Sequence, residues 1–76
     1  MLFPNSHTQK AKKVHYDKVD DTTAYVGIAF IGTADSSSGW KIRKLTFNTE
    51  GDVTVQTVGT DGFDQIWDNR TGLSYI

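Results

Sequence analysis

The residue types that most often carry out chemistry are sparse and widely spaced in this chain. Its two histidines, His7 and His15, show no His-x-x-x-His or His-Glu-x-x-His spacing for a zinc ion. The chain has no cysteine, which removes disulfides and thiolate zinc sites. A histidine that transfers protons needs a partner within hydrogen-bond reach, and the sequence indicates none. We therefore expect both histidines to be surface residues.

A cluster of carboxylates near the C-terminus is the second candidate. Asp61, Asp64 and Asp68 fall within eight residues, and a helix would place the last two on one face. Oxygen ligands of this kind suit calcium, and paired carboxylates suit acid–base catalysis. A calcium loop of the EF-hand type needs a longer ligand series that ends in Glu, which is missing here. A solvated helix edge is favoured, so we expect no catalytic residue, no cofactor and no metal ion.

A basic and aromatic segment is the third candidate. Trp40, Lys41, Arg43 and Lys44 resemble surfaces that stack single-stranded nucleic acid over a positive groove. The aromatic positions also fall where a core needs them, and the formal net charge of −1 gives no overall field that attracts nucleic acid. We favour a core strand with solvated lysines. A small nucleic-acid- or peptide-binding module that uses residues 40–47 is kept as the alternative function.

The apolar pattern predicts a β-protein that follows an unpatterned start. Residues 1–11 are expected to form an extended or disordered N-terminal arm, and residues 12–76 a single small β-domain. Both faces of segment 23–31 are apolar, one bulky and one mostly small, which predicts a strand between two covering layers. Gly27 inside this segment indicates a bulge or a close backbone approach.

The second half of the chain predicts a hairpin made by segments 40–47 and 53–58. In the first of these segments, the apolar residues at 40 and 42 have the opposite parity to those at 45 and 47. An unbroken strand would send the two pairs to opposite sides. We favour a β-bulge at Arg43–Lys44, which brings all four to one face, over a strand that is buried on both sides.

A change of apolar spacing to a helical period predicts a short helix over about 62–70, with a closing strand at 73–76. The expected fold is therefore mainly β: a small antiparallel sheet or sandwich of four to five strands with one short C-terminal helix. The expected core contains the large apolar residues of these elements: Val26, Ile28, Phe30, Trp40, Ile42, Leu45, Phe47, Val53, Val55, Phe63, Ile66 and Trp67.

Two further segments could make contacts with other proteins. The polar loop 32–39 is long for a hairpin, so it is either a contact surface or an inert connector. The N-terminal arm is either a docking segment or a frayed end. The expected interface residues lie in these two segments: Leu2, Phe3, Thr33, Asp35, Ser36 and Ser37.

A set of short motifs between residues 25 and 75 resembles small structural proteins of tailed bacteriophages. The most specific part is Phe-Asp-x-Ile-Trp-Asp-Asn-Arg at 63–70. The other matching groups are Tyr25-Val26-Gly27, Ile31-Gly32, Ala34 through Ser38, Trp40-Lys41-Ile42 with Leu45, Gly51-Asp52-Val53, Asp61-Gly62 and Leu73-Ser74-Tyr75. Residues 1–22 match nothing in that pattern.

The resemblance implies association with a virion and implies no catalytic residues. The expected function is that of a non-enzymatic virion structural protein, a capsid decoration, neck or tail component, that works as a repeated homo-oligomeric unit. Its expected partners are itself and other virion proteins, and its expected location is the virion after synthesis in the host cytoplasm. No apolar run reaches the ~20 residues that cross a bilayer, so no membrane partner is expected, and no nucleic acid partner is expected either.

Overall fold

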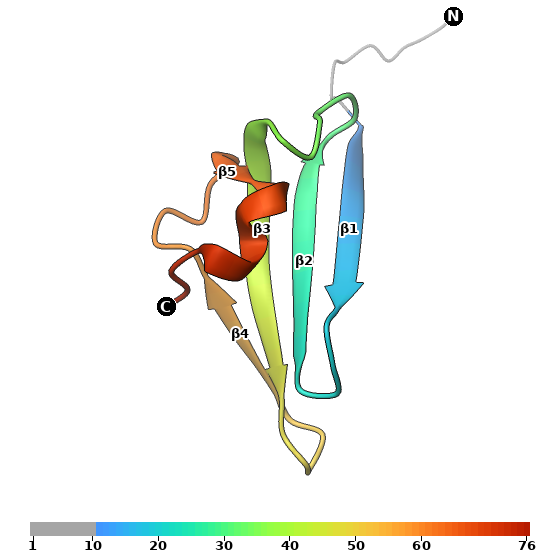
Figure 1. Cartoon of the computed structure of the whole chain (residues 1–76), viewed down its shortest axis with the longest axis vertical. Coiled ribbons are helices and arrows are strands. Elements are labelled where there is room, and N and C mark those ends of the chain that lie inside the picture. The colour runs from blue at the N-terminus through green and yellow to red at the C-terminus, as the bar shows by residue number, and fades with distance from the viewer. Residues whose placement is uncertain (1–10) are drawn as a thin grey trace, which may run out of the picture.

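The structure of the protein is a computed structural model, and it describes residues 11–76. The described chain is mainly β, as the sequence predicts, and its antiparallel strands follow one another in the meander of Figure 1. The elements are β1 (Lys12–Lys18), β2 (Thr23–Phe30), β3 (Ser38–Phe47), β4 (Val53–Thr57), β5 (Gln65–Ile66) and the 3₁₀ helix η1 (Trp67–Gly72). The expected arm at residues 1–11 lies outside the described part except for Ala11.

The hairpin of β3 and β4 confirms the predicted pairing of these segments. Its turn is built by Asn48, whose side-chain oxygen accepts hydrogen bonds from the backbone N–H groups of Glu50 (3.0 Å) and Asp52 (2.9 Å). Gly51 takes a φ of 88°, which a residue without a Cβ adopts at little cost. The local turn chemistry therefore fixes the register of the two strands.

The predicted bulge at Arg43–Lys44 is wrong. Residues 41–46 pair one to one with β2, and residues 43–47 pair one to one with β4. The irregularity in β3 lies nearer its start, between Ser38 and Trp40, where β5 pairs with it. An unbroken β3 therefore sends apolar side chains to both faces of the sheet.

The core lies on one face of the sheet, beneath η1, which crosses in front of β3 in Figure 1. Directly opposite residues of antiparallel strands share a face, so the register places Tyr25 and Ala29 of β2 on the same side as Ile42 of β3. Trp40 and Trp67 complete this buried cluster, with relative exposures of 0% and 5%. The three predicted core residues of this face, Trp40, Ile42 and Trp67, are buried as expected.

The C-terminal helix is shorter and begins later than the predicted span of about 62–70. Gln65 and Ile66 are extended because they pair with β3, and a 3₁₀ helix follows from Trp67 to Gly72. The chain then returns to the edge of β4, where a bridge joins Val58 to Tyr75. The predicted closing strand is thus present as this short pairing. None of the helices in residues 11–76 has the length and apolar character needed to cross a membrane.

The second face of the sheet overturns the prediction that β2 lies between two covering layers. Within the described chain, η1 and the C-terminal residues pack on one face, and the bulky residues of β2 lie half-exposed on the other. Predicted core residues of the neighbouring elements are exposed: Val53 by 49%, Val55 by 54% and Phe63 by 37%. Ile66 is half-buried. The physical reason is that an unbroken strand sends apolar side chains to both faces of the sheet, which then needs two covering layers, and residues 11–76 supply one.

Candidate functional site

A feature of the fold that is available for function is the face of the sheet that residues 11–76 leave uncovered, which we call the open face. Its apolar residues follow from the strand register: Val14, Tyr16, Val26, Ile28, Phe30, Leu45, Phe47, Val53 and Val55, joined by Phe63 from the β4–β5 connection. Most of these residues were predicted as core. The sequence thus showed that they share an apolar surface, but not that this surface is exposed. Val14 and Tyr16 were missed because the alternation in β1 is weak.

The open face extends across β1, β2, β3 and β4. Val14 is 62% exposed and Tyr16 is 58% exposed, so the edge at β1 is the barest part. Four strands spaced ~4.8 Å apart and about eight residues long give a footprint on the order of 500 Å². The largest apolar patch of an ordinary monomer is about 300–600 Å², and patches of this size often mark interaction sites.

One end of the open face is basic. The Nζ atom of Lys12 lies 5.0 Å from the centre of the Phe30 ring, and that of Lys41 lies 4.9 Å from the centre of the Phe63 ring. The two phenyl rings pack together with their centres 5.4 Å apart. Each lysine therefore holds its ammonium group over the face of an aromatic ring in a cation–π contact.

An ion pair crosses the open face beside this basic end. The Arg43 guanidinium donates hydrogen bonds to Asp61 through Nε (3.4 Å) and Nη2 (3.1 Å). These hydrogen bonds, together with the positive charges of Arg43 and Lys41, hold the pKa of the Asp61 carboxyl below its usual value. Asp61 has a φ of 46°, a left-handed conformation that Asp tolerates better than most residues. The pair anchors the β4–β5 connection to β3.

The opposite end of the open face is acidic. Asp20 and Asp21 lie in the β1–β2 turn, and Glu50 and Asp52 lie in the β3–β4 turn. Lys18 of β1 is also on this face, with its Nζ 4.0 Å from Asp21 Oδ1, and the carboxylates outnumber it. Hydrogen bonds from the backbone N–H and hydroxyl of Thr22 hold the pKa of Asp20 below its usual value. A hollow of about 410 Å³ opens between these turns, and it is lined by Asp21, Thr22, Phe47, Asn48 and Thr49.

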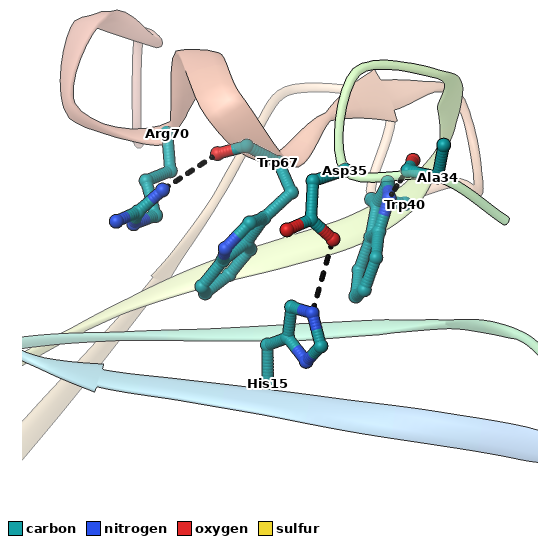
Figure 2. A network of polar contacts seen from close by, with 6 residues as sticks. All are labelled: His15, Ala34, Asp35, Trp40, Trp67 and Arg70. Atoms are coloured by element: carbon teal, nitrogen blue, oxygen red, sulfur yellow. Dashed lines mark hydrogen bonds and ion pairs between the residues drawn. The ribbon is translucent and has the colours of Figure 1, made fainter.

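A histidine network occupies the covered face near the start of β3, and Figure 2 shows its side chains. His15 Nε2 lies 3.0 Å from Asp35 Oδ1, and the imidazole packs against both indoles, with ring centres 4.7 Å from Trp40 and 5.4 Å from Trp67. The indole N–H of Trp40 donates to the Ala34 carbonyl at 2.9 Å. The network thus fastens loop 32–39 to the sheet. His15 is at the surface, as expected, with 35% of its side chain exposed. Its packing against the two indoles and its contact with Asp35 were not predicted.

Arg70 fastens η1 to the same face. Its Nε donates to Asp17 of β1 at 2.9 Å, its Nη1 donates to the Trp67 carbonyl at 3.1 Å, and the guanidinium lies 4.5 Å from the centre of the Trp67 ring. The Tyr75 hydroxyl donates to the Arg70 carbonyl at 2.7 Å. Together these contacts form a clamp that holds η1 against β1 and the C-terminal residues.

The predicted interface residues fall in two places. Leu2 and Phe3 lie outside the described residues. In the loop, Ser36 and Ser37 are exposed, Asp35 is exposed but holds His15, and Thr33 is half-buried beside Gly39. Loop 32–39 is therefore ordered by contacts with the sheet, and its role as a contact surface stays a prediction.

The three carboxylates of the predicted cluster are dispersed. Asp61 pairs with Arg43, Asp64 accepts hydrogen bonds from Thr60 and Gln65, and Asp68 is exposed on η1. In residues 11–76 no group of three His, Cys, Asp or Glu side chains is placed to hold a metal ion. Asp64 and Asp68 do not share a helix face, because the helix begins only at Trp67.

The basic and aromatic segment 40–47 is divided between the two faces. Trp40 is fully buried on the covered face, and its indole packs against Trp67 with ring centres 5.5 Å apart. Lys44 shares that side because it is paired with Tyr25, whereas Lys41 and Arg43 lie on the open face. The strand therefore does not present these side chains as one stacking surface for nucleic acid.

Comparison with protein-family models, with curated proteins and with solved structures finds no match for this chain. The functional interpretation accordingly depends on the open face and on the motifs of the sequence.

Proposed function

We propose that the chain is a non-enzymatic structural protein of a tailed-phage virion, a capsid decoration, neck or tail component, that works as a repeated unit through protein–protein contacts. The observation that carries this proposal is the open face, a half-exposed apolar layer that spans four strands. A small domain buries only about 60% of the surface that its unfolded chain exposes. A neighbouring subunit that covers such a face adds stability by binding the folded state alone.

The motif that carries the phage resemblance has a structural role, which supports the proposal. Residues 63–70 place Phe63 on the open face, pair Ile66 with β3, and bring Trp67 and Arg70 onto the covered face. The motif therefore wraps one edge of the sheet and contacts both of its faces. Residues of this kind are needed to specify a fold, which agrees with a resemblance that implies no catalytic residues.

The test is to measure the protein in purified virus particles from the cells that make it. Quantitative mass spectrometry of gradient-purified particles should find the chain in a fixed, multiple copy number relative to the main capsid protein. A second preparation, washed at high salt, separates built-in subunits from adsorbed protein. Particles that form and infect normally without this chain in any fixed ratio would overturn the proposal.

A further inference from the structure

We propose that a second copy of this chain covers the open face, so that two sheets pack face to face as a two-fold symmetric sandwich. The inference rests on the proposed function, because it names the first partner of a repeated structural unit. It further assigns the direction of packing: the strands of the two copies run in opposite directions. The basic end of each open face then meets the acidic end of the other.

The area of the open face agrees with a pairwise interface. Two flat footprints on the order of 500 Å² each remove about 1,000 Å² from water, and the relief of the side chains raises the accessible area above this value. Specific interfaces bury about 1,200–2,000 Å² in total, and about 1,000 Å² is the lower bound for a biological one. Face-to-face sheets pack ~10 Å apart with interdigitating side chains, which suits the Val, Ile, Leu and Phe side chains of the open face.

The N-terminal segment of the same chain is a poorer occupant. Residues 1–10 contain only Met1, Leu2, Phe3 and Pro4 as apolar residues. The open face presents ten large apolar side chains across four strands, from Val14 at one edge to Val55 at the other. One extended strand of such a segment covers a width of only ~5 Å. A second open face matches the width and the apolar character of the first.

Charge selects the direction of the pairing. Lys12 and Lys41 lie at one end of the open face. The turns at the other end hold four carboxylates, Asp20, Asp21, Glu50 and Asp52, against one lysine, Lys18, so that end keeps an excess of negative charge. A two-fold axis along the strands would place like charges together at both ends, which is unfavourable. An axis in the interface plane and perpendicular to the strands places each basic end over an acidic end.

The same axis stacks β2 over the partner's β2 and β3 over the partner's β3. The aromatic pair Phe30 and Phe63, with Lys41 above it, then faces the hollow of about 410 Å³ that Asp21 and Phe47 line in the other copy. Phe30 and Phe63 would fill this hollow, and Lys41 would meet the Asp21 carboxylate beside it. Buried aromatic contacts of this kind dominate the binding energy of interfaces. The two-fold axis produces the same contact twice.

The experiment measures the mass of the full chain in solution by sedimentation equilibrium over a wide concentration range. We expect a reversible dimer of twice the 8.5 kDa chain mass. Val14→Glu buries an unpaired charge in the proposed interface and should raise the dimer dissociation constant at least ~100-fold. The matched control is Ile31→Glu, because Ile31 is an equally exposed aliphatic residue (66%, against 62% for Val14) that lies in the turn after β2. Circular dichroism of both variants checks that the sheet is intact.

Charge reversal tests the direction of packing. Lys12→Glu with Lys41→Glu should weaken the dimer, and adding Asp20→Lys with Asp21→Lys to the same chain should restore it, because each reversed end again meets its opposite. Lys13→Glu is the control, since Lys13 lies at the same end of the molecule but over Trp40 on the covered face. A dimer without this rescue would overturn the assigned direction.

Other results would overturn the pairing itself. A monomer at all concentrations, or a dimer that Val14→Glu and Ile31→Glu weaken equally, would remove the open face as the interface. A chain that becomes a dimer only after deletion of residues 1–10 would identify that segment as the occupant. A monomer that binds single-stranded oligonucleotide, with affinity lost in Lys12→Glu, would assign the face to nucleic acid. Each result is independent of the particle measurement, so the pairing and the virion role can fail separately.

Discussion

The indole ring of Trp67 occupies the space that a side chain at Gly27 would fill. A Cβ atom built on Gly27 would lie 2.5 Å from Trp67 Cζ3 and 3.0 Å from Trp40 Cε3. The prediction that this glycine marks a close backbone approach is therefore confirmed. Gly27 sits in the middle of β2, between His15 of β1 and Ile42 of β3. The absence of a side chain at this point lets η1 pack its tryptophan directly on the sheet.

Gly27→Ala should displace Trp67 and lower the free energy of unfolding by about 1–3 kcal/mol, the usual cost of overpacking a core. The contact is with rigid indole rings, so it cannot be relieved by moving the end of a flexible side chain. Gly59→Ala is the control, because nothing lies near a Cβ at that position and its φ is ordinary. Urea unfolding of both variants measures the difference. Equal stability of the two variants would contradict the packing of Trp67 on Gly27.

Loop 32–39 should depend on His15 for its order. His15→Ala removes both the bond to Asp35 and the stacking on the two indoles, whereas Asp35→Asn weakens only the bond. An exposed polar contact between side chains contributes about 0–1 kcal/mol and an aromatic pair about 0.5–1.5 kcal/mol. We therefore expect His15→Ala to accelerate hydrogen exchange in the loop about tenfold, and Asp35→Asn to have a smaller effect.

The exchange is followed at two N–H groups that donate hydrogen bonds to the Ala34 carbonyl. The indole N–H of Trp40 donates to its carbonyl at 2.9 Å, and the backbone N–H of Ser37 donates to the same carbonyl at 3.0 Å. Nuclear magnetic resonance resolves both signals. If exchange at these two sites is unchanged in His15→Ala, the histidine does not hold the loop.

The Arg43–Asp61 pair predicts a loss of stability in acid. The pKa of the Asp61 carboxyl is lower in the folded chain than its ordinary value of 3.8, mainly because Arg43 donates hydrogen bonds to it. A depressed pKa contributes stability that is present above the unfolded value and lost as the pH falls through the folded value. Asp61→Asn should therefore have a lower free energy of unfolding than the wild type at neutral pH. The two free energies should become equal as the pH falls below 3.8.

Asn is a suitable replacement because it tolerates the positive φ of residue 61 as Asp does. Asp68→Asn, an exposed carboxylate on η1, is the control for a general change of charge. Because Asp61 is near the surface, added salt should narrow the difference between Asp61→Asn and the wild type. Urea unfolding at several pH values measures these differences. A constant difference from neutral pH into acid would show that the pair does not link protonation to folding.

The sequence predicted the strands well because local signals determine them. Turn residues such as Asn48 and Gly51 set the β3–β4 hairpin, and alternation set β2. Two features could not be predicted from the sequence. The bulge in β3 was predicted wrongly, because an apolar face that is open and one that is buried have the same pattern of residues. The partner of His15 was missed because Asp35 lies 20 residues away and meets it only through the β2–β3 connection.

The tyrosine clamp at the C-terminus predicts a transition at high pH. Burial, with a smaller contribution from Tyr25, raises the pKa of the Tyr75 phenol from 10.0 to about 12, while its hydroxyl donates to the Arg70 carbonyl. A raised pKa contributes stability that is fully present below pH 10 and is lost as the pH rises toward about 12. The free energy of unfolding of the wild type should therefore exceed that of Tyr75→Phe below pH 10, and the difference should disappear as the pH rises toward about 12.

At neutral pH the hydroxyl of Tyr75 is expected to contribute about 1 kcal/mol, the net value of an ordinary hydrogen bond. The absorbance of tyrosinate, followed from neutral pH to strong alkali, should show a late step in the wild type that is missing in Tyr75→Phe. Tyr16→Phe is the control, because Tyr16 lies on the other face of the sheet and has no part in the clamp. If the late step persists in Tyr75→Phe and disappears in Tyr16→Phe, then the contact between Tyr75 and Arg70 is not the source of the transition.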